Sequence, residues 1–263
     1  RGRKFIEALE HRFHNGDFEG HTLRNALLTA MELTSDLDAA IATFARILQI
    51  PKFSGVIPTT LTGVTQQVVD PDGNVLGEGE HSIAHTADLQ TNSTWQPGDV
   101  RVQFAENGIE FNSRAQEALE NATYIIIAPG HTYGTILPAL ASLSLSPSFS
   151  VKDVEAKLIV IMTLLTTPRH TTGWSGEDFV RVYESYLGRG VDVVVANQGE
   201  VPLDLVDGQA WVTFEDTEHS YRLLEGDIVS TEEQKGVDGD VVPRAITVHD
   251  EDKMREVFEK LLT

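Results

Sequence analysis

The spacing of apolar residues predicts an alternation of strands and helices in the middle of the chain. Short apolar runs at 124–128, 157–162 and 191–196 are bounded by Gly, Pro and polar residues, which is typical of buried strands. The segments at 134–143 and 175–187 have the three-to-four-residue spacing of amphipathic helices. Strands that alternate with helices predict an α/β fold with a parallel sheet and right-handed crossovers.

The first fifty residues instead predict amphipathic helices without strands between them, at 5–13, 23–34 and 37–48. From Pro51 onward the chain is rich in Thr, Val and Gly, and a strong turn sequence at 70–74 separates two predicted strands. We interpret this second part as a β-rich excursion from the α/β core, such as a lid or flap.

We expect the whole chain to form one α/β domain. Its last part is acidic and rich in turns, and it closes with a predicted strand at 245–248 and a helix that begins at Asp250 or Glu251. The expected parts are a helical segment (1–50), the β-rich excursion (51–110), the α/β core (111–200) and the acidic C-terminal part (201–263).

The charge of the chain limits its partners. Among 263 residues there are 40 acidic and 20 basic side chains, a formal net charge of −20. Such a surface argues against binding to nucleic acid, which needs basic side chains to neutralise phosphates, and against adhesion to anionic lipid. The bland interpretation of the acidic excess is a solvated face that keeps the protein soluble.

Cysteine is absent from the chain, which excludes disulfides, thiolate nucleophiles and cysteine-ligated metals. This composition fits a reducing compartment, so we expect a cytoplasmic protein. No apolar run approaches the roughly 20 residues of a membrane helix. The oligomeric state stays open, and a homo-oligomer is one alternative.

The first candidate site follows the strand at 124–128. In an open α/β sheet, ligands bind just beyond the carboxyl ends of the strands. The hydroxyl groups and backbone amides of this segment are suited to a diphosphate. Its tyrosine ring, that of Tyr133, could stack on a base or a sugar. Its histidine, His131, could donate a hydrogen bond or act as a general acid. The alternative is a tight strand-to-helix turn whose glycines serve geometry alone. The candidate ligand-binding residues are Pro129, Gly130, His131, Thr132, Tyr133 and Thr135.

The second candidate site follows the strand at 157–162 and contains Thr166, Thr167, Arg169 and His170. The forked guanidinium of an arginine is suited to phosphate or carboxylate. In so acidic a chain, a loop with Arg and His but no acid is unusual. The alternative is a solvated surface loop.

The third candidate site is the start of the predicted helix at 23–34. Gly20 lets the backbone approach a ligand, Thr22 can cap the helix, and His21 and Asn25 share one face. Free N–H groups at a helix start favour phosphate. The alternative is an ordinary capped helix with a structural His and Asn.

Metal and hydrolase chemistry have little support in the sequence. None of the nine histidines has the spacing of a metal-binding helix, and no P-loop, Gly-x-Gly-x-x-Gly or Gly-x-Ser-x-Gly motif is present. A magnesium ion carried with a diphosphate ligand remains an alternative, although its carboxylates cannot be identified from the pattern.

Taken in order, these motifs resemble the gluconeogenesis-factor family, which is related to the 2-phospho-L-lactate transferases. The resemblance covers roughly residues 5 to 200 and rests on three segments: Gly20-His21-Thr22 with Asn25, Pro129-Gly130 with Tyr133 and Thr135, and Thr166-Thr167-Pro168 with Thr172-Gly173. It implies a doubly wound, Rossmann-like sheet and a nucleotide-linked ligand such as a uridine diphosphate sugar. The glycine-rich strand-loop-helix that opens the family pattern is not part of this sequence.

Two departures from the family pattern concern the ligand. His131 stands where the family has Ser, and Arg169-His170 stand where it has Gly-Glu. The second departure replaces an acid by a base, which can alter the choice of ligand.

The resemblance leaves three functions open. The leading one is a nucleotide-sugar-binding regulatory protein of carbon metabolism and cell-wall morphogenesis. The alternative is a transferase that moves a phospholactyl-type group from a guanosine diphosphate donor to a deazaflavin alcohol, with magnesium as the family's metal. The third is an interaction protein that has kept the fold without the pocket.

Overall fold

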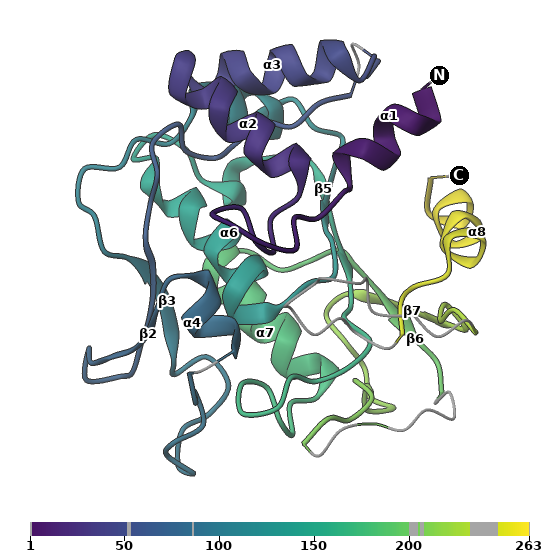
Figure 1. Cartoon of the computed structure of the whole chain (residues 1–263). Helices are drawn as coiled ribbons and strands as arrows, with labels where there is room; N and C mark the ends of the chain where they lie inside the picture. The colour runs from purple at the N-terminus through teal and green to yellow at the C-terminus, as the bar shows by residue number, and fades with distance from the viewer. Residues whose placement is uncertain are drawn as a thin grey trace.

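The computed structural model describes residues 2–51, 54–85, 87–199, 205, 208–231 and 247–262. Figure 1 shows strands and helices of a central α/β part, a smaller β-rich part at the left of the view and the first three helices at the top. None of the described helices combines the length and the apolar character needed to cross a bilayer.

A four-stranded parallel sheet forms the centre of the α/β part. The strands follow one another across the sheet in chain order, and all three neighbouring pairs are parallel. The predicted parallel α/β class is therefore confirmed. The strands are β4 (Tyr124–Ile127), β5 (Lys157–Ile161), β6 (Val193–Asn197) and β7 (Arg222–Gly226).

The sheet has a hydrophobic core on each face. Along β5, Leu158 and Val160 belong to one core cluster, and Ile159 between them belongs to the other. Successive side chains of a strand point to opposite faces, which separates the two clusters. Helix α7 (Gly176–Leu187) adds Phe179 to the first core, and helix α8 (Glu251–Leu262) packs on the second. Helices on both faces agree with the doubly wound, Rossmann-like fold.

The connection after β4 differs in detail from the single predicted helix at 134–143. It begins as a π-helical turn, η1 (Thr132–Ile136), continues as helix α6 (Leu137–Ser142) and ends in a 3-10 turn at Leu143–Leu145. Short π-helical segments are rare and frequently occur at functional sites. The spacing of apolar residues could not distinguish the π-helical turn from an α-helical one. The hydrogen bonds of the two kinds of turn differ by only one residue in their sequence spacing.

The β-rich excursion forms an antiparallel sheet of β1 (Gln66–Val69), β2 (Val75–Glu78) and β3 (Arg101–Phe104), in the order β2-β1-β3. The predicted turn at 70–74 is present. Asp70 accepts hydrogen bonds from the backbone and side chain of Asn74, and these bonds lower the pKa of its carboxyl group. A helix that the pattern did not predict, α4 (Glu80–His85), follows β2 and buries Ile83 fully.

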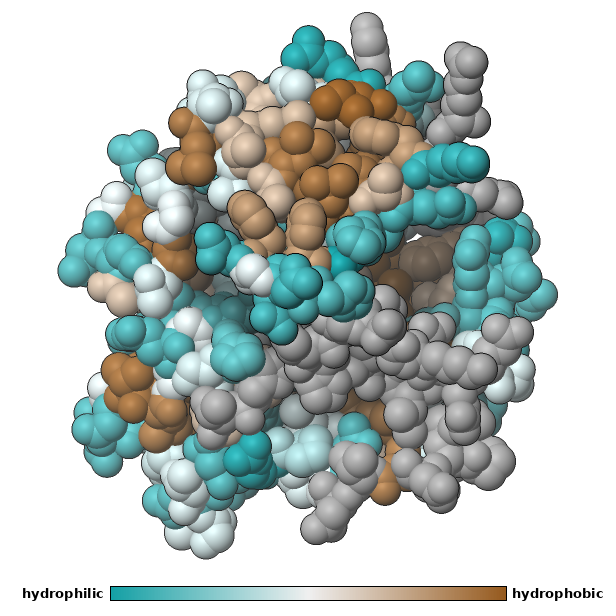
Figure 2. All heavy atoms as spheres, viewed as in Figure 1, coloured by the Kyte–Doolittle hydropathy of each residue, from teal (hydrophilic) through white to brown (hydrophobic). Residues whose placement is uncertain are grey.

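The three N-terminal helices are α1 (Gly2–Leu9), α2 (Leu23–Thr34) and α3 (Leu37–Ile47). The first is shorter than the predicted 5–13, because residues 12 and 13 instead form bridges to Thr22 and Glu19. Helix α2 has no buried residue. Figure 2 accordingly shows apolar side chains gathered at the top of the view, over α2 and α3.

Strand β7 was missed by the sequence pattern. Only two of its five residues, Leu223 and Leu224, are apolar side chains, so it does not stand out as an apolar run. It is identified by its parallel pairing with β6, which is a long-range contact. Residues 245 and 246 of the predicted last strand lie outside the described residues, and residues 247 and 248 are described but do not form a strand. The predicted division into one domain with four parts remains a prediction.

Helix α8 is preceded by His249, whose Nε2 donates a hydrogen bond to the backbone oxygen of Met162, 3.1 Å away at the end of β5. Burial lowers the pKa of this imidazole from its ordinary value of 6.5, although the hydrogen bond opposes the shift. The unfolded chain therefore binds a proton more readily than the folded chain does, so stability should fall as the pH drops below that value.

We predict that His249→Gln flattens this part of the pH dependence. Urea unfolding between about pH 8 and about pH 5.5 measures it, because the slope reports protons taken up on unfolding. His14→Gln at an exposed position is the control. An equal slope in wild type and His249→Gln would contradict the assignment.

Candidate functional site

The loops that follow β4 and β5 meet at a pair of histidines. Nε2 of His131 lies 3.0 Å from Nδ1 of His170, and the two rings are nearly perpendicular, with centroids 5.1 Å apart. Since β4 and β5 are parallel neighbours, both loops leave the same edge of the sheet. The structure therefore brings together the first two of the three candidate segments.

Hydrogen bonds on either side of this pair assign its protons. The backbone N–H of Gly134 donates to Nδ1 of His131 at 2.8 Å, so that nitrogen is an acceptor. His131 then carries its proton on Nε2 and donates it to His170, whose own Nε2 donates to the backbone oxygen of Ala87 at 3.0 Å. For two neutral rings, the hydrogen-bond network implies this assignment of tautomers. These bonds link His131, the N-cap of η1, to the loop after β5 and to Ala87, which follows α4.

The loop after β5 is held in a compact shape by its own hydroxyl groups. Oγ1 of Thr171 accepts a hydrogen bond from the backbone of Thr167, and Oγ1 of Thr172 accepts one from the backbone of Arg169. Arg169 has a φ of 63°, in the left-handed region that residues other than Gly seldom adopt. Its side chain is exposed. Such a backbone conformation is a feature that functional sites often share.

Several of the predicted site residues are buried and make hydrogen bonds within the protein. Thr166 receives a hydrogen bond from the backbone of Ala210 at 2.8 Å. The hydroxyl of Tyr133 points to the backbone oxygen of Val100, 3.5 Å away, and burial raises the pKa of this phenol. The buried members of the predicted set are Thr22, Thr132, Tyr133, Thr166 and His170.

The remaining predicted residues are at least partly accessible. They are the residues that an incoming ligand can reach without a rearrangement of the core. Those exposed are His21, Asn25, Pro129, Thr135 and Arg169, and those of intermediate exposure are Gly20, Gly130, His131 and Thr167. A direct contact of any of them with a ligand remains a prediction.

The third candidate segment is folded as predicted, but its neighbours are local. Thr22 caps α2 by accepting a hydrogen bond from the backbone of Asn25 at 3.3 Å. The backbone oxygen of Gly20 accepts a hydrogen bond from Arg12, and that of His21 accepts one from Phe13. These bonds fix the segment against the chain that precedes it. Its convergence on the crevice of the other two segments stays a prediction.

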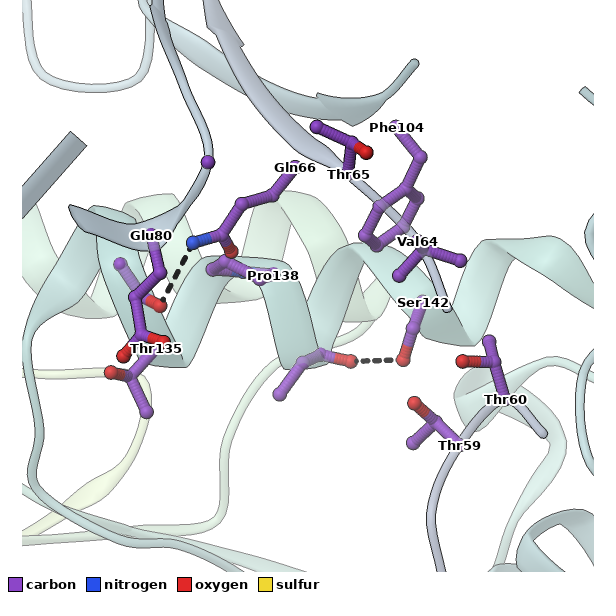
Figure 3. Close-up of a pocket in the computed structure, with 13 residues that line it drawn as sticks. Thr59, Thr60, Val64, Thr65, Gln66, Glu80, Phe104, Thr135, Pro138 and Ser142 are labelled. Carbon is purple, nitrogen blue, oxygen red and sulfur yellow. Dashed lines mark hydrogen bonds between the residues drawn. The ribbon is translucent and has the colours of Figure 1, made fainter. Parts of the chain in front are cut away.

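A cavity of about 580 Å³ lies between η1, α6 and the β-rich excursion. Figure 3 shows hydroxyl groups around it and two hydrogen bonds at its wall, from Gln66 to the backbone of Gly134 and from Ser142 to that of Ala139. Its size is within the range of small-molecule sites. The lining residues are Thr59, Thr60, Val64, Thr65, Gln66, Gly79, Glu80, Phe104, Gly134, Thr135, Pro138, Ala139 and Ser142.

Most of this lining was absent from the sequence-based site. Thr59, Thr60 and Thr65 stand before β1 in a region that the pattern assigned to a lid or flap, so the only available signal was its richness in threonine. Only Thr135 belongs to both the predicted set and the lining. The contribution of the excursion depends on its docking against α6, which local patterns do not encode.

The donor set does not fit a magnesium ion. Within the described part of the chain, no three His, Asp or Glu side chains are grouped as metal ligands. The lining of the cavity supplies one carboxylate, that of Glu80. A magnesium site in proteins commonly needs carboxylates together with substrate phosphates. No chemical step is therefore assigned to a metal held by these residues.

The comparison with protein families identifies the class. The chain belongs to the family described as "2-phospho-L-lactate transferase CofD", whose model matches residues 3–237. This confirms the resemblance drawn from the three sequence segments.

Individual relatives are named gluconeogenesis factor. The chain is 27% identical over 201 residues to the gluconeogenesis factor of Bacillus subtilis, with coverage of 74% of this chain and 58% of the relative. It is 28% identical over 206 residues to the gluconeogenesis factor of Listeria monocytogenes, with coverage of 77% and 60%. The chain thus spans about three fifths of the length of these relatives.

A solved structure supports the fold. A crystal structure of a UPF0052 family member from Bacillus halodurans superposes with a TM-score of 0.74 at 22% identity, and the match covers 97% of this chain and 77% of that one. The likeness extends over nearly the whole chain and therefore includes most of the β-rich excursion.

Proposed function

We propose that this chain binds a nucleotide-linked diphosphate at the carboxyl edge of its parallel sheet and acts as a transferase of the 2-phospho-L-lactate type. The observation that carries the proposal is the contact between His131 and His170. It holds the loops after β4 and β5 together at the edge where open α/β sheets bind ligands. The family to which the chain belongs supports the type of reaction.

The residues suited to the diphosphate are Thr135 and Arg169, which are exposed on these two loops. A guanidinium can bind two phosphate oxygens at once, and a hydroxyl can donate to a third. An anion must overcome the repulsion of a chain with a net charge of −20, so a fixed cation at the site has a large effect on its affinity.

The reaction proposed for this edge is a group transfer from a guanosine diphosphate-type donor. The oxygen of an acceptor alcohol forms a bond to the phosphorus of the phospholactyl group, and the bond from that phosphorus to the nucleotide phosphate breaks. The acceptor proton leaves with a base, and the nucleoside monophosphate is the leaving group. The part of this chain is to position the donor, since positioning and charge stabilisation dominate phosphoryl transfer.

Binding and turnover are measured separately. Calorimetry with guanosine diphosphate and with a uridine diphosphate sugar should show binding, and Arg169→Ala should weaken it about tenfold or more. Arg46→Ala, an exposed arginine of α3, is the control. Incubation with a phospholactyl-guanosine donor and a deazaflavin alcohol should release the nucleoside monophosphate. No heat and no thermal shift at millimolar ligand would refute the proposal.

A second function is supported by the relatives named gluconeogenesis factor. In it, the same edge binds a nucleotide sugar and the protein regulates carbon metabolism or cell-wall morphogenesis in the cytoplasm. Binding of the uridine diphosphate sugar without turnover of the phospholactyl donor would favour this second function over the first.

A further inference from the structure

The cavity of about 580 Å³ between η1, α6 and the β-rich excursion has polar groups at both ends. Figure 3 shows Glu80 at one end, and Thr60 and Ser142 at the other. Phe104 and Pro138 add apolar surface to the lining. A volume of this size suits a small molecule, and the order of polar and apolar groups along the cavity indicates what that molecule must offer.

The hydroxyl groups of Thr60 and Ser142 already use their protons inside the protein. Oγ of Ser142 donates to the backbone oxygen of Ala139 at 2.7 Å, and Oγ1 of Thr60 donates to that of Thr62 at 3.1 Å. A hydroxyl has one proton to donate and two lone pairs that accept. These two groups can therefore offer a guest only lone pairs, so the guest must bring the hydrogen-bond donor to this end of the cavity.

The group at the other end, the carboxylate of Glu80, is an acceptor as well. Glu80 is the first residue of α4, and its side chain makes no hydrogen bond or ion pair with any other described residue. Among the described residues that line the cavity, there is no Lys, Arg or His. An ionised carboxylate only accepts hydrogen bonds, so its best partner is a group that combines positive charge with N–H donors.

Hydrogen bonds hold the walls of the cavity in place before any guest enters. The side chain of Asn112 donates to the backbone oxygen of Pro58 at 2.9 Å, and its backbone N–H donates to that of Thr59 at 2.7 Å. Nε2 of Gln66 donates to the backbone oxygen of Gly134 at 3.4 Å, which links β1 to η1. Walls that are shaped in advance lower the entropy that a ligand must offset on binding.

We propose that this cavity binds a protonated amine that has an apolar body and a second hydrogen-bond donor. The ammonium group pairs with Glu80, the body packs on Phe104 and Pro138, and the second donor bonds to Thr60 and Ser142. The net charge of −20 attracts such a cation to the protein and repels an anion. The site goes beyond the proposed function, because its guest carries the charge opposite to that of the diphosphate.

Calorimetry with tyramine and its analogues tests the charge of the guest. Tyramine carries an ammonium group, an aromatic ring and a phenolic O–H. Tyrosol replaces the ammonium group by a neutral hydroxyl, and hydroxyphenylpropionate replaces it by a carboxylate. Tyramine should bind with saturation, tyrosol should bind about tenfold more weakly, and hydroxyphenylpropionate should bind more weakly than both, because it meets the charge of Glu80 with a like charge.

Glu80→Gln assigns the ammonium group to its end of the cavity. The substitution keeps the shape of the side chain and removes its charge, so the affinity for tyramine should fall about tenfold and that for tyrosol should stay as in wild type. A distorted cavity would lose both ligands alike, so the ratio of the two affinities separates lost charge from lost structure. Glu110→Gln, at an exposed position outside the cavity, should bind tyramine like wild type.

Thr60→Val assigns the second donor to the opposite end. The variant lacks the lone pairs of the hydroxyl, so its affinity for tyramine should fall several-fold. Its affinity for phenethylamine, which has no phenolic O–H, should stay as in wild type, and this unchanged affinity shows that the cavity is intact. Thr91→Val, at an exposed position outside the cavity, is the control.

Tyramine binding that exceeds that of both analogues and depends on Glu80 and Thr60 supports the proposal. Equal affinity for tyramine and tyrosol, tighter binding of hydroxyphenylpropionate, an unchanged tyramine affinity in either variant, or no binding of any probe overturns it. Guanosine diphosphate is titrated in separate experiments, and Arg169, the cation of the proposed diphosphate site, does not line the cavity. Failure of either site therefore leaves the other standing.

Discussion

Replacement of Phe179 by alanine should lower the free energy of unfolding by about 3–5 kcal/mol, the range for loss of a large buried aromatic side chain. Phe179 is fully buried in the first turns of α7. Its ring packs edge-on against Trp174, with centroids 5.1 Å apart, and tilted against Tyr183 at 6.3 Å. The substitution removes the ring from the core that joins α7 to the sheet and leaves a cavity there.

Phe18→Ala is the matched control, because Phe18 is 54% exposed and its removal deletes the same atoms from the surface. Urea unfolding followed by circular dichroism should show a shift of the midpoint for Phe179→Ala that is several times that for Phe18→Ala. Equal shifts of the two midpoints would mean that the core between α7 and the parallel sheet is not assembled around Phe179.

Replacement of Gly134 by alanine should have the largest effect on the candidate site. A Cβ at this position would lie 2.8 Å from Nδ1 of His131, closer than real Cβ atoms approach. The imidazole would have to move, and it would lose its hydrogen bonds to the backbone of Gly134 and to His170. We expect a loss of about 1–3 kcal/mol in the free energy of unfolding, as for other overpacked positions.

The functional consequence of Gly134→Ala separates the histidine pair from general stability. Gly63→Ala is the control, since a Cβ there meets nothing within 4 Å. Diphosphate binding should weaken in Gly134→Ala at a temperature where both variants are fully folded, and it should be unchanged in Gly63→Ala. Wild-type affinity in folded Gly134→Ala would show that the contact between the two loops is irrelevant to the ligand.

The sequence predicted best the elements whose structure depends on their own residues. The mainly apolar runs of β5 and β6 and the capped start of α7 at Ser175 depend on a few neighbouring residues. Ser175 and Asp178 form a capping box, with Asp in the place of the usual Glu or Gln. Strand β7 was missed because only its pairing with β6 makes it a strand.

The candidate site, too, could be predicted only where it depends on local sequence. The position of the loops after β4 and β5 was predictable, because parallel neighbouring strands end at one edge. Which side chains are exposed was not, since Thr166 and Tyr133 have the chemistry of binding residues but are buried in contact with Ala210 and Val100. The wall that the excursion contributes to the cavity beside η1, including Thr59 and Thr65, depends on contacts between residues far apart in the chain.

A crystal structure grown with a nucleoside diphosphate tests the central claim most directly. The account predicts phosphate oxygens within hydrogen-bonding distance of both loops, with the side chains of Thr135 and Arg169 among their partners. It also predicts that the His131–His170 contact persists in the complex. A diphosphate bound away from both loops would contradict the account.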